Sequence, residues 1–109
     1  MLAMAGEDLD AVTGEIIGRA FAAGDPLATE ILTESAEMVA LWLGNMIDLL
    51  DPDVIVIGGG AAALFSPFFD HLRQRIPQLT VNPRTNEVPI VSSRYGSDSG
   101  IAGGAALCA

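Results

Sequence analysis

An α/β fold built around a parallel crossover is predicted for this chain of 109 residues. Helical periodicity runs without interruption from Pro26 to Leu50, four β-branched residues stand together at 54–57, and a second β-type segment follows at 88–92. Helical segments flank and separate the two strands, so the expected order of elements is α-α-β-α-β-α. The connection between two such strands is a right-handed crossover.

Capping residues mark the first two helices. Thr13 can cap a short helix that ends before Gly24, because glycine readily adopts the left-handed conformation found at helix ends. Asp25 and Pro26 then suit the N-cap and the first turn of the long helix. Residues 1–12 are expected to form an irregular lead-in.

The apolar pattern predicts how deeply the central elements are buried. In the long helix the polar face fades after Glu37, so the second half, around Trp42, is expected to be buried on most sides. The run Val54–Ile57 has no polar alternation, which is typical of a strand covered on both faces.

The second half of the chain contains one crossover helix, one strand and a final helix. Ser66-Pro67 is expected to be the cap and first turn of a helix that ends at Pro77. Residues 78–87 are expected to be a loop, Val88–Ser92 a strand and Ser97–Leu107 a helix of small residues. A sheet of two strands is marginal by itself.

Composition excludes several classes of function. The chain has 14 acidic and five basic residues, all five being arginine, and a net charge of −9. Neither a nucleic-acid surface nor an anionic membrane suits such a charge. The lead-in lacks the basic residues of a signal peptide, and the longest apolar stretch, Met38–Leu50, is too short to span a bilayer. A cytoplasmic location is therefore expected.

The strongest functional feature is the triple glycine Gly58, Gly59 and Gly60, which directly follows the first strand. Ligands of open α/β sheets bind beyond the carboxyl ends of strands, and glycine lets the backbone approach a ligand. The alternative interpretation is a flexible turn between strand and helix. No dinucleotide fingerprint and no P-loop is present, and the chain has no lysine.

The final helix contains glycines at 100, 103 and 104, each of which costs about 1 kcal/mol relative to alanine. They indicate either close packing against the sheet, which is favoured, or a helix that must flex.

Groups for acid–base chemistry or metal binding are scarce. His71 is the only histidine and is expected to be a solvated surface residue, while Cys108 is the only cysteine and is expected to be packed or frayed. Asp48, Asp51 and Asp53 cluster at the amino end of the first strand, where capping and turn roles suit them. No catalytic residue and no metal ligand is predicted.

Three stretches, Ala22–Ala28, Asn45–Gly60 and Asp98–Ala106, resemble the C-terminal segment of the ROK family of bacterial sugar kinases and sugar-responsive repressors. The likeness extends from Thr13 nearly to the end of the chain. Its most specific part is the middle stretch, in which a helix, Asp-Pro, a hydrophobic strand and Gly-Gly occur in register. Gly104 stands where the family more often has alanine.

The resemblance implies the actin–hexokinase (ribonuclease H-like) fold, with residues 13–109 forming part of the C-terminal lobe. It implies that Gly58, Gly59 and Gly60 form the adenosine-binding loop for ATP with magnesium, and that the helix with Gly100 and Gly103 connects two lobes. A sugar substrate and a homo-oligomer are also implied. The family's phosphate loop, catalytic aspartate and zinc motif have no counterpart in this sequence.

Two classes of parent protein follow from the resemblance. The first is a kinase that phosphorylates a hexose with ATP, which the intact glycine loop favours. The second is a repressor whose sugar-binding body keeps the fold. A truncated product without activity is the third interpretation. Sugar contacts are expected to lie outside this segment.

Overall fold

The computed structural model of the chain describes residues 1–109. Its helices and strands are α1 (Gly14–Ala22), α2 (Pro26–Leu50), β1 (Ile55–Ile57), α3 (Ala62–Phe65), α4 (Phe69–Arg75), β2 (Ile90–Ser92) and α5 (Ser99–Leu107). The lead-in contains two short 3-10 turns. Apart from the division of the crossover helix into α3 and α4, the order is the predicted one.

The predicted caps form. The Thr13 side chain accepts a hydrogen bond from the Ile16 N–H at 3.4 Å, and Asp25 accepts one from the Ala28 N–H at 2.9 Å. Gly24, between the two helices, has a φ of +83°, which a side chain would strain. These local interactions fix where α1 ends and where α2 begins.

The crossover helix differs from the prediction at Ser66-Pro67. Ser66 makes no capping hydrogen bond, and a 3-10 turn at Ser66–Phe68 joins α3 to α4. Helical structure therefore starts at Ala62, directly after the glycine loop. Pro67 was expected at the start of a helix and occupies the first turn of the 3-10 segment instead, which is equally compatible with its fixed φ.

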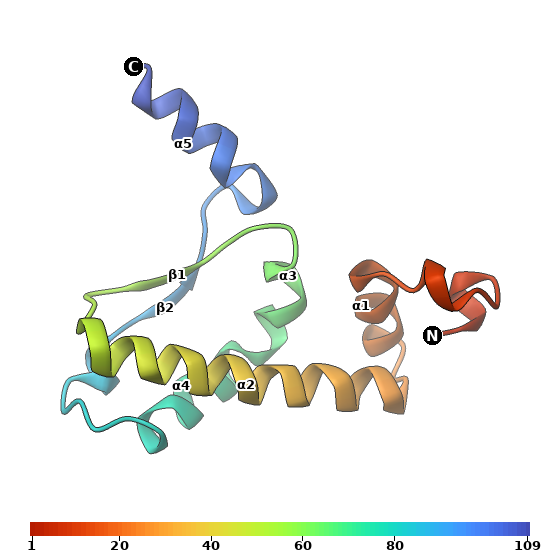
Figure 1. The fold of residues 1–109 in the computed structure, drawn as a ribbon, viewed down its shortest axis with the longest axis horizontal. Coiled ribbons are helices and arrows are strands. Elements are labelled where there is room, and N and C mark those ends of the chain that lie inside the picture. The colour runs from red at the N-terminus through yellow and green to blue at the C-terminus, as the bar shows by residue number, and fades with distance from the viewer.

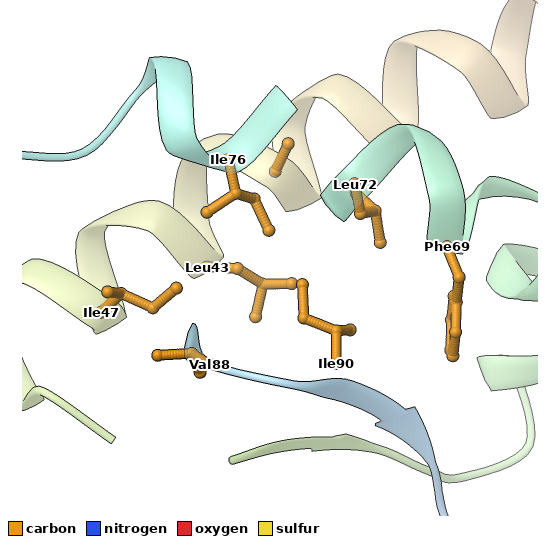
Figure 2. Close-up of a cluster of buried hydrophobic side chains, with 8 residues drawn as sticks. Leu43, Ile47, Phe69, Leu72, Ile76, Val88 and Ile90 are labelled. Atoms are coloured by element: carbon orange, nitrogen blue, oxygen red, sulfur yellow. The ribbon is translucent and has the colours of Figure 1, made fainter. Parts of the chain in front are cut away.

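β1 and β2 pair in parallel, with Ile55 beside Ile90 and Ile57 beside Ser92. One face of this sheet packs on α2 and α4. Figure 2 shows the side chains of these helices converging on β2. The buried cluster consists of Ala40, Leu43, Ile47, Phe69, Leu72, Ile76, Val88 and Ile90.

The expected burial of the central elements is wrong in two places. The second half of α2 is open on its outer side, where Trp42 is 60% exposed. β1 is covered on one face only, and Val54 and Val56 are exposed on the other. No element of residues 1–109 packs over these side chains, so the apolar residues that were expected to be buried form an exposed surface.

The final helix also departs from expectation. α5 projects away from the sheet and the other helices (Figure 1). A Cβ on Gly100, Gly103 or Gly104 would meet no atom within 4 Å. The favoured interpretation, close packing against the sheet, is therefore wrong for this chain.

Candidate functional site

The carboxyl ends of both strands lie at one edge of the sheet and form the candidate site. β1 leads into Gly58–Gly60, and β2 leads into the segment Ser93–Gly96. The Ser93 N–H donates a hydrogen bond to the Ile57 carbonyl at 2.9 Å, which holds the two segments together. Sheets of this kind bind ligands at this edge.

The three glycines of the loop differ in what they require. A Cβ on Gly58 would lie 2.9 Å from the Ser93 hydroxyl oxygen, so Gly58 permits close packing between the two segments. Gly59 has a φ of +97°, a conformation that residues with side chains rarely adopt. Gly60 has neither constraint, because its Cβ would enter open space and its φ is not positive.

Two of the cavities beside the glycine loop are lined by Gly60. The larger, of about 730 Å³, lies between α1 and the α3 region. Its lining includes Glu15, Gly18, Arg19, Gly60 and Leu64. The smaller, of about 250 Å³, lies between the glycine loop and the end of β2. Its lining includes Gly59, Gly60, Ser93 and Ser97. Gly60 is thus the residue of the loop that borders both.

The α1 wall of the larger cavity was missed by the sequence interpretation. α1 approaches α3 so closely that a Cβ on Gly18 would lie 2.7 Å from the Leu64 Cδ2. Gly14 borders the same side chain at 3.4 Å. Two glycines four residues apart on one helix face are a weak signal for such an approach. Their partner, Leu64, could not be identified from sequence.

The serines after β2 were also missed. The Ser99 hydroxyl donates to the Gly96 carbonyl at 2.7 Å and lies 3.1 Å from the Ser93 hydroxyl. These bonds fold the segment after β2 back on itself beside Gly58. They give the smaller cavity a polar wall opposite the glycine loop.

His71 lies on α4 and is exposed, as predicted, within a group of ionisable side chains. Its Nε2 is 2.6 Å from Glu37 Oε1, and the Arg75 Nε donates to Glu37 Oε2 at 2.9 Å. The hydrogen bond from Arg75, followed by that from His71, lowers the pKa of Glu37. The three side chains tie α4 to α2 and border neither cavity.

The three aspartates at the amino end of β1 have structural partners, and Asp51 has the predicted capping position, whereas Asp48 contacts a distant loop instead. Asp48 accepts hydrogen bonds from the Val81 and Asn82 N–H groups, at 3.1 and 3.0 Å. Asp51 ends α2 in a left-handed conformation, and a hydrogen bond from the Asn82 side chain lowers its pKa. Asp53 lies 3.5 Å from Arg84. These contacts attach the loop at 79–84 to the end of α2.

No group of three or more histidine, cysteine, aspartate or glutamate side chains has the arrangement of a metal site. Cys108 is exposed beyond the end of α5, as a frayed end would be. None of the helices combines the length and the apolar composition needed to cross a membrane.

A mixed α/β fold with a glycine loop at the carboxyl edge of a parallel sheet defines the class of this protein. The sequence profile described as "ROK family" matches residues 1–109. The chain therefore belongs to the ROK family, and the resemblance found in its sequence is confirmed.

Curated relatives are sugar kinases by name. The chain is 35% identical over 101 residues to an N-acetyl-D-glucosamine kinase of Pasteurella multocida. The aligned residues make up 90% of this chain and 32% of that kinase. It is 38% identical over 96 residues to the N-acetyl-D-glucosamine kinase of Mannheimia succiniciproducens, and the aligned residues make up 85% of this chain and 30% of that kinase. The chain thus spans about a third of the length of these relatives.

A solved structure confirms the fold class. The crystal structure of a ROK family glucokinase from Streptomyces griseus, in complex with glucose and AMPPNP, superposes with a TM-score of 0.83 at 23% identity. The match covers 97% of this chain and 34% of the glucokinase chain. The chain therefore has the fold of one part of an actin–hexokinase-like kinase.

Proposed function

We propose that this chain is the part of an ATP-dependent sugar kinase that supplies the adenosine-binding loop. The observation that carries the proposal is the position of Gly60, which borders both cavities at the carboxyl edge of the sheet with no side chain in either. The names of the relatives favour a kinase over the repressor alternative, and they favour N-acetyl-D-glucosamine or a related hexose as the sugar.

The residues present fit an adenosine group. The backbone of Gly59 and Gly60 offers a wall without Cβ atoms against which a ribose or a base can lie. Ser93 and Ser97 offer hydroxyl groups on the opposite side of the smaller cavity. Glu15 and Arg19 on α1 offer the polar groups of the larger one.

The proposed role is binding and orientation of the nucleotide. ATP with magnesium would supply the phosphoryl group, and this chain has no lysine to pair with the phosphates. The loop at Gly58–Gly60 would hold the adenosine end fixed. The sugar contacts, a homo-oligomeric assembly and a cytoplasmic location stay predictions.

The structure identifies Gly60, rather than Gly59, as the residue to substitute. Valine at Gly59 would strain a backbone φ of +97° and would report on folding as well as on binding. Valine at Gly60 enters open space with an ordinary backbone, so its effect reports on the ligand.

The test uses a chimera in which this chain replaces the matching third of the Pasteurella multocida kinase. Calorimetric titration of Gly60→Val should show at least a tenfold weaker affinity for ATP and a sugar affinity within about twofold of the parent. Gly59→Ala serves as the strain control and should lower the melting temperature. Unchanged ATP affinity in a folded Gly60→Val chimera would overturn the adenosine assignment.

A further inference from the structure

A notch of two glycines on α1 receives one side chain of α3. A Cβ on Gly14 would lie 3.4 Å from Leu64 Cδ1, and a Cβ on Gly18 would lie 2.7 Å from Leu64 Cδ2. The first separation is an ordinary contact, whereas the second leaves no room for a methyl group. Glycine in a helix interior is unfavourable relative to alanine, so the contact with Leu64 gives Gly18 a packing reason that α1 alone does not supply.

Other contacts fix α1 in its position. Ala20 is fully buried, and the Phe21 ring packs against the Phe68 ring with 5.4 Å between the two centroids. Leu64, in contrast, meets Gly18 with a methyl group at the end of a rotatable side chain. When a methyl group is added at position 18, we therefore expect the Leu64 side chain to turn and α1 to stay.

The cavity beside this contact suits the base of a nucleotide. Gly18 and Leu64 both line the larger cavity, of about 730 Å³, together with apolar side chains such as Phe21 and Pro67. A flat aromatic base fits a largely apolar cavity that has a few polar groups. The smaller cavity, of about 250 Å³, is lined by serine hydroxyl groups, which suit a ribose. Gly60 lies between the two.

We propose that Gly18 is a positioning residue that sets the size of the base which this site accepts. Because Gly18 has no side chain, Leu64 lies against α1 and leaves the larger cavity open. A methyl group at position 18 turns the Leu64 side chain into that cavity, so a purine loses more affinity than a pyrimidine. This inference rests on the proposed nucleotide-binding function and adds to it the residue that limits the base.

The experiment titrates the full chain, labelled with ¹⁵N-glycine, with ATP and with UTP. The two nucleotides have the same ribose and triphosphate, so the ratio of their affinities isolates the base. The amide resonance of Gly60, which lines the cavity, reports binding. In Gly18→Ala the ratio of ATP affinity to UTP affinity should fall about tenfold, a usual effect of one carbon atom in a tight apolar pocket. A purely structural defect would weaken both nucleotides and leave the ratio unchanged.

A second-site variant and a control accompany this measurement. Gly18→Ala combined with Leu64→Ala should recover the parent ratio, because the side chain that the new methyl group displaces is gone. Gly103→Ala is the matched control, since it is the same substitution in a helix, its Cβ would meet no atom within 4 Å, and it does not line the larger cavity. Its ratio should equal that of the parent. Circular dichroism checks that each variant folds.

Leu64→Ala alone tests the same assignment if Gly18→Ala does not fold. Leu64 is only partly buried, so the chain should tolerate its truncation. The shorter side chain widens the larger cavity, which Leu64 lines. The fluorescent etheno derivative of ATP, whose base is bulkier than adenine, should therefore gain about tenfold in affinity relative to ATP.

An unchanged ATP-to-UTP ratio in a folded Gly18→Ala chain that still binds ATP would overturn this inference and leave the proposed function intact. The same holds for a lowered ratio that Leu64→Ala does not restore, because Gly18 would then act without Leu64, and for an unchanged preference between ATP and its etheno derivative in Leu64→Ala. A parent chain that binds no ATP would instead count against the proposed function, and this inference would fall with it.

Discussion

Gly58 and Ser93 face one another across the two strand ends, at a separation that leaves no room for a Cβ on Gly58. Gly58→Ala should therefore destabilise the chain by about 1–3 kcal/mol, the usual cost of overpacking. Urea denaturation measures the change. The double variant Gly58→Ala with Ser93→Gly should recover most of the loss, because it removes the atoms that the new methyl group would meet.

Gly60→Ala is the control for this experiment. Its Cβ would meet no atom within 4 Å, so its free energy of unfolding should stay within about 0.5 kcal/mol of the parent or rise slightly. Equal losses for Gly58→Ala and Gly60→Ala would contradict the packing explanation and indicate a general intolerance of the loop.

The sequence predicted those features that depend on neighbouring residues. The start of α2 was predicted at Pro26 because Asp25 supplies the capping oxygen three residues before the Ala28 N–H. Ser66-Pro67 was misinterpreted because Ser-Pro suits the start of an α-helix and of a 3-10 turn equally well. The local sequence predicts that a helical turn forms there, but it does not decide between an α-helical and a 3-10 turn.

Burial was predicted less well, because it depends on contacts between distant residues. Trp42 and Val56 have the sequence context of buried residues, yet both are more than half exposed, because no element of residues 1–109 packs over them. In the candidate site, the glycine loop was found from its position after β1. The α1 wall at Gly18 was not found, because its partner Leu64 is distant in the sequence.

Asp48 holds the loop after α4 through the N–H groups of Val81 and Asn82. Asp48→Ala should lower the free energy of unfolding by about 1 kcal/mol, since these hydrogen bonds to a carboxylate are lost. Thermal denaturation should show this as a fall of about 4–8 °C in Tm. Asp53→Ala, at a carboxylate with one 3.5 Å contact, should leave Tm nearly unchanged, and a comparable fall there would contradict the assignment.

Glu37 makes stability depend on pH in the acid range. Its pKa is lowered by the hydrogen bonds from Arg75 and His71. A lowered carboxyl pKa stabilises the folded state above the unfolded pKa, and this contribution disappears as the pH falls through the folded pKa. Glu37→Gln should therefore lose less stability than the parent between about pH 5 and pH 3.

Melting temperatures measured at intervals from pH 7 to pH 3 check this prediction. Glu30→Gln is the control, because Glu30 is exposed on the same helix and takes part in no ion pair. Its pH profile should follow that of the parent. Parallel profiles for the parent and Glu37→Gln would show that the contacts with Arg75 and His71 do not persist in solution.

The exposed apolar residues around Trp42 and Val56, together with the free edge of β1, should make the chain marginally stable and prone to associate. Its association should increase with salt, because salt screens the repulsion between chains of net charge −9. Light scattering at several protein and salt concentrations measures this association, and Trp42 emission reports whether this apolar surface is exposed. A monodisperse monomer at all conditions with a cooperative thermal transition would contradict the prediction.

The chain alone should transfer no phosphoryl group from ATP to a sugar. Its one histidine is 2.6 Å from Glu37 and borders neither cavity beside the glycine loop. It contains no lysine to pair with phosphates, and no cluster of side chains with the arrangement of a metal site. Transfer depends on positioning and on charge stabilisation around the phosphates, and the smaller cavity beside the glycine loop is lined by serine hydroxyl groups, backbone and apolar side chains, with no charged side chain. A coupled assay with ATP, magnesium, N-acetyl-D-glucosamine and a panel of hexoses should show only background turnover. The assay should be repeated with Gly60→Val, since activity from a contaminating kinase would be the same in both preparations. Turnover that copurifies with the chain and falls in Gly60→Val would show that this segment carries catalytic groups of its own.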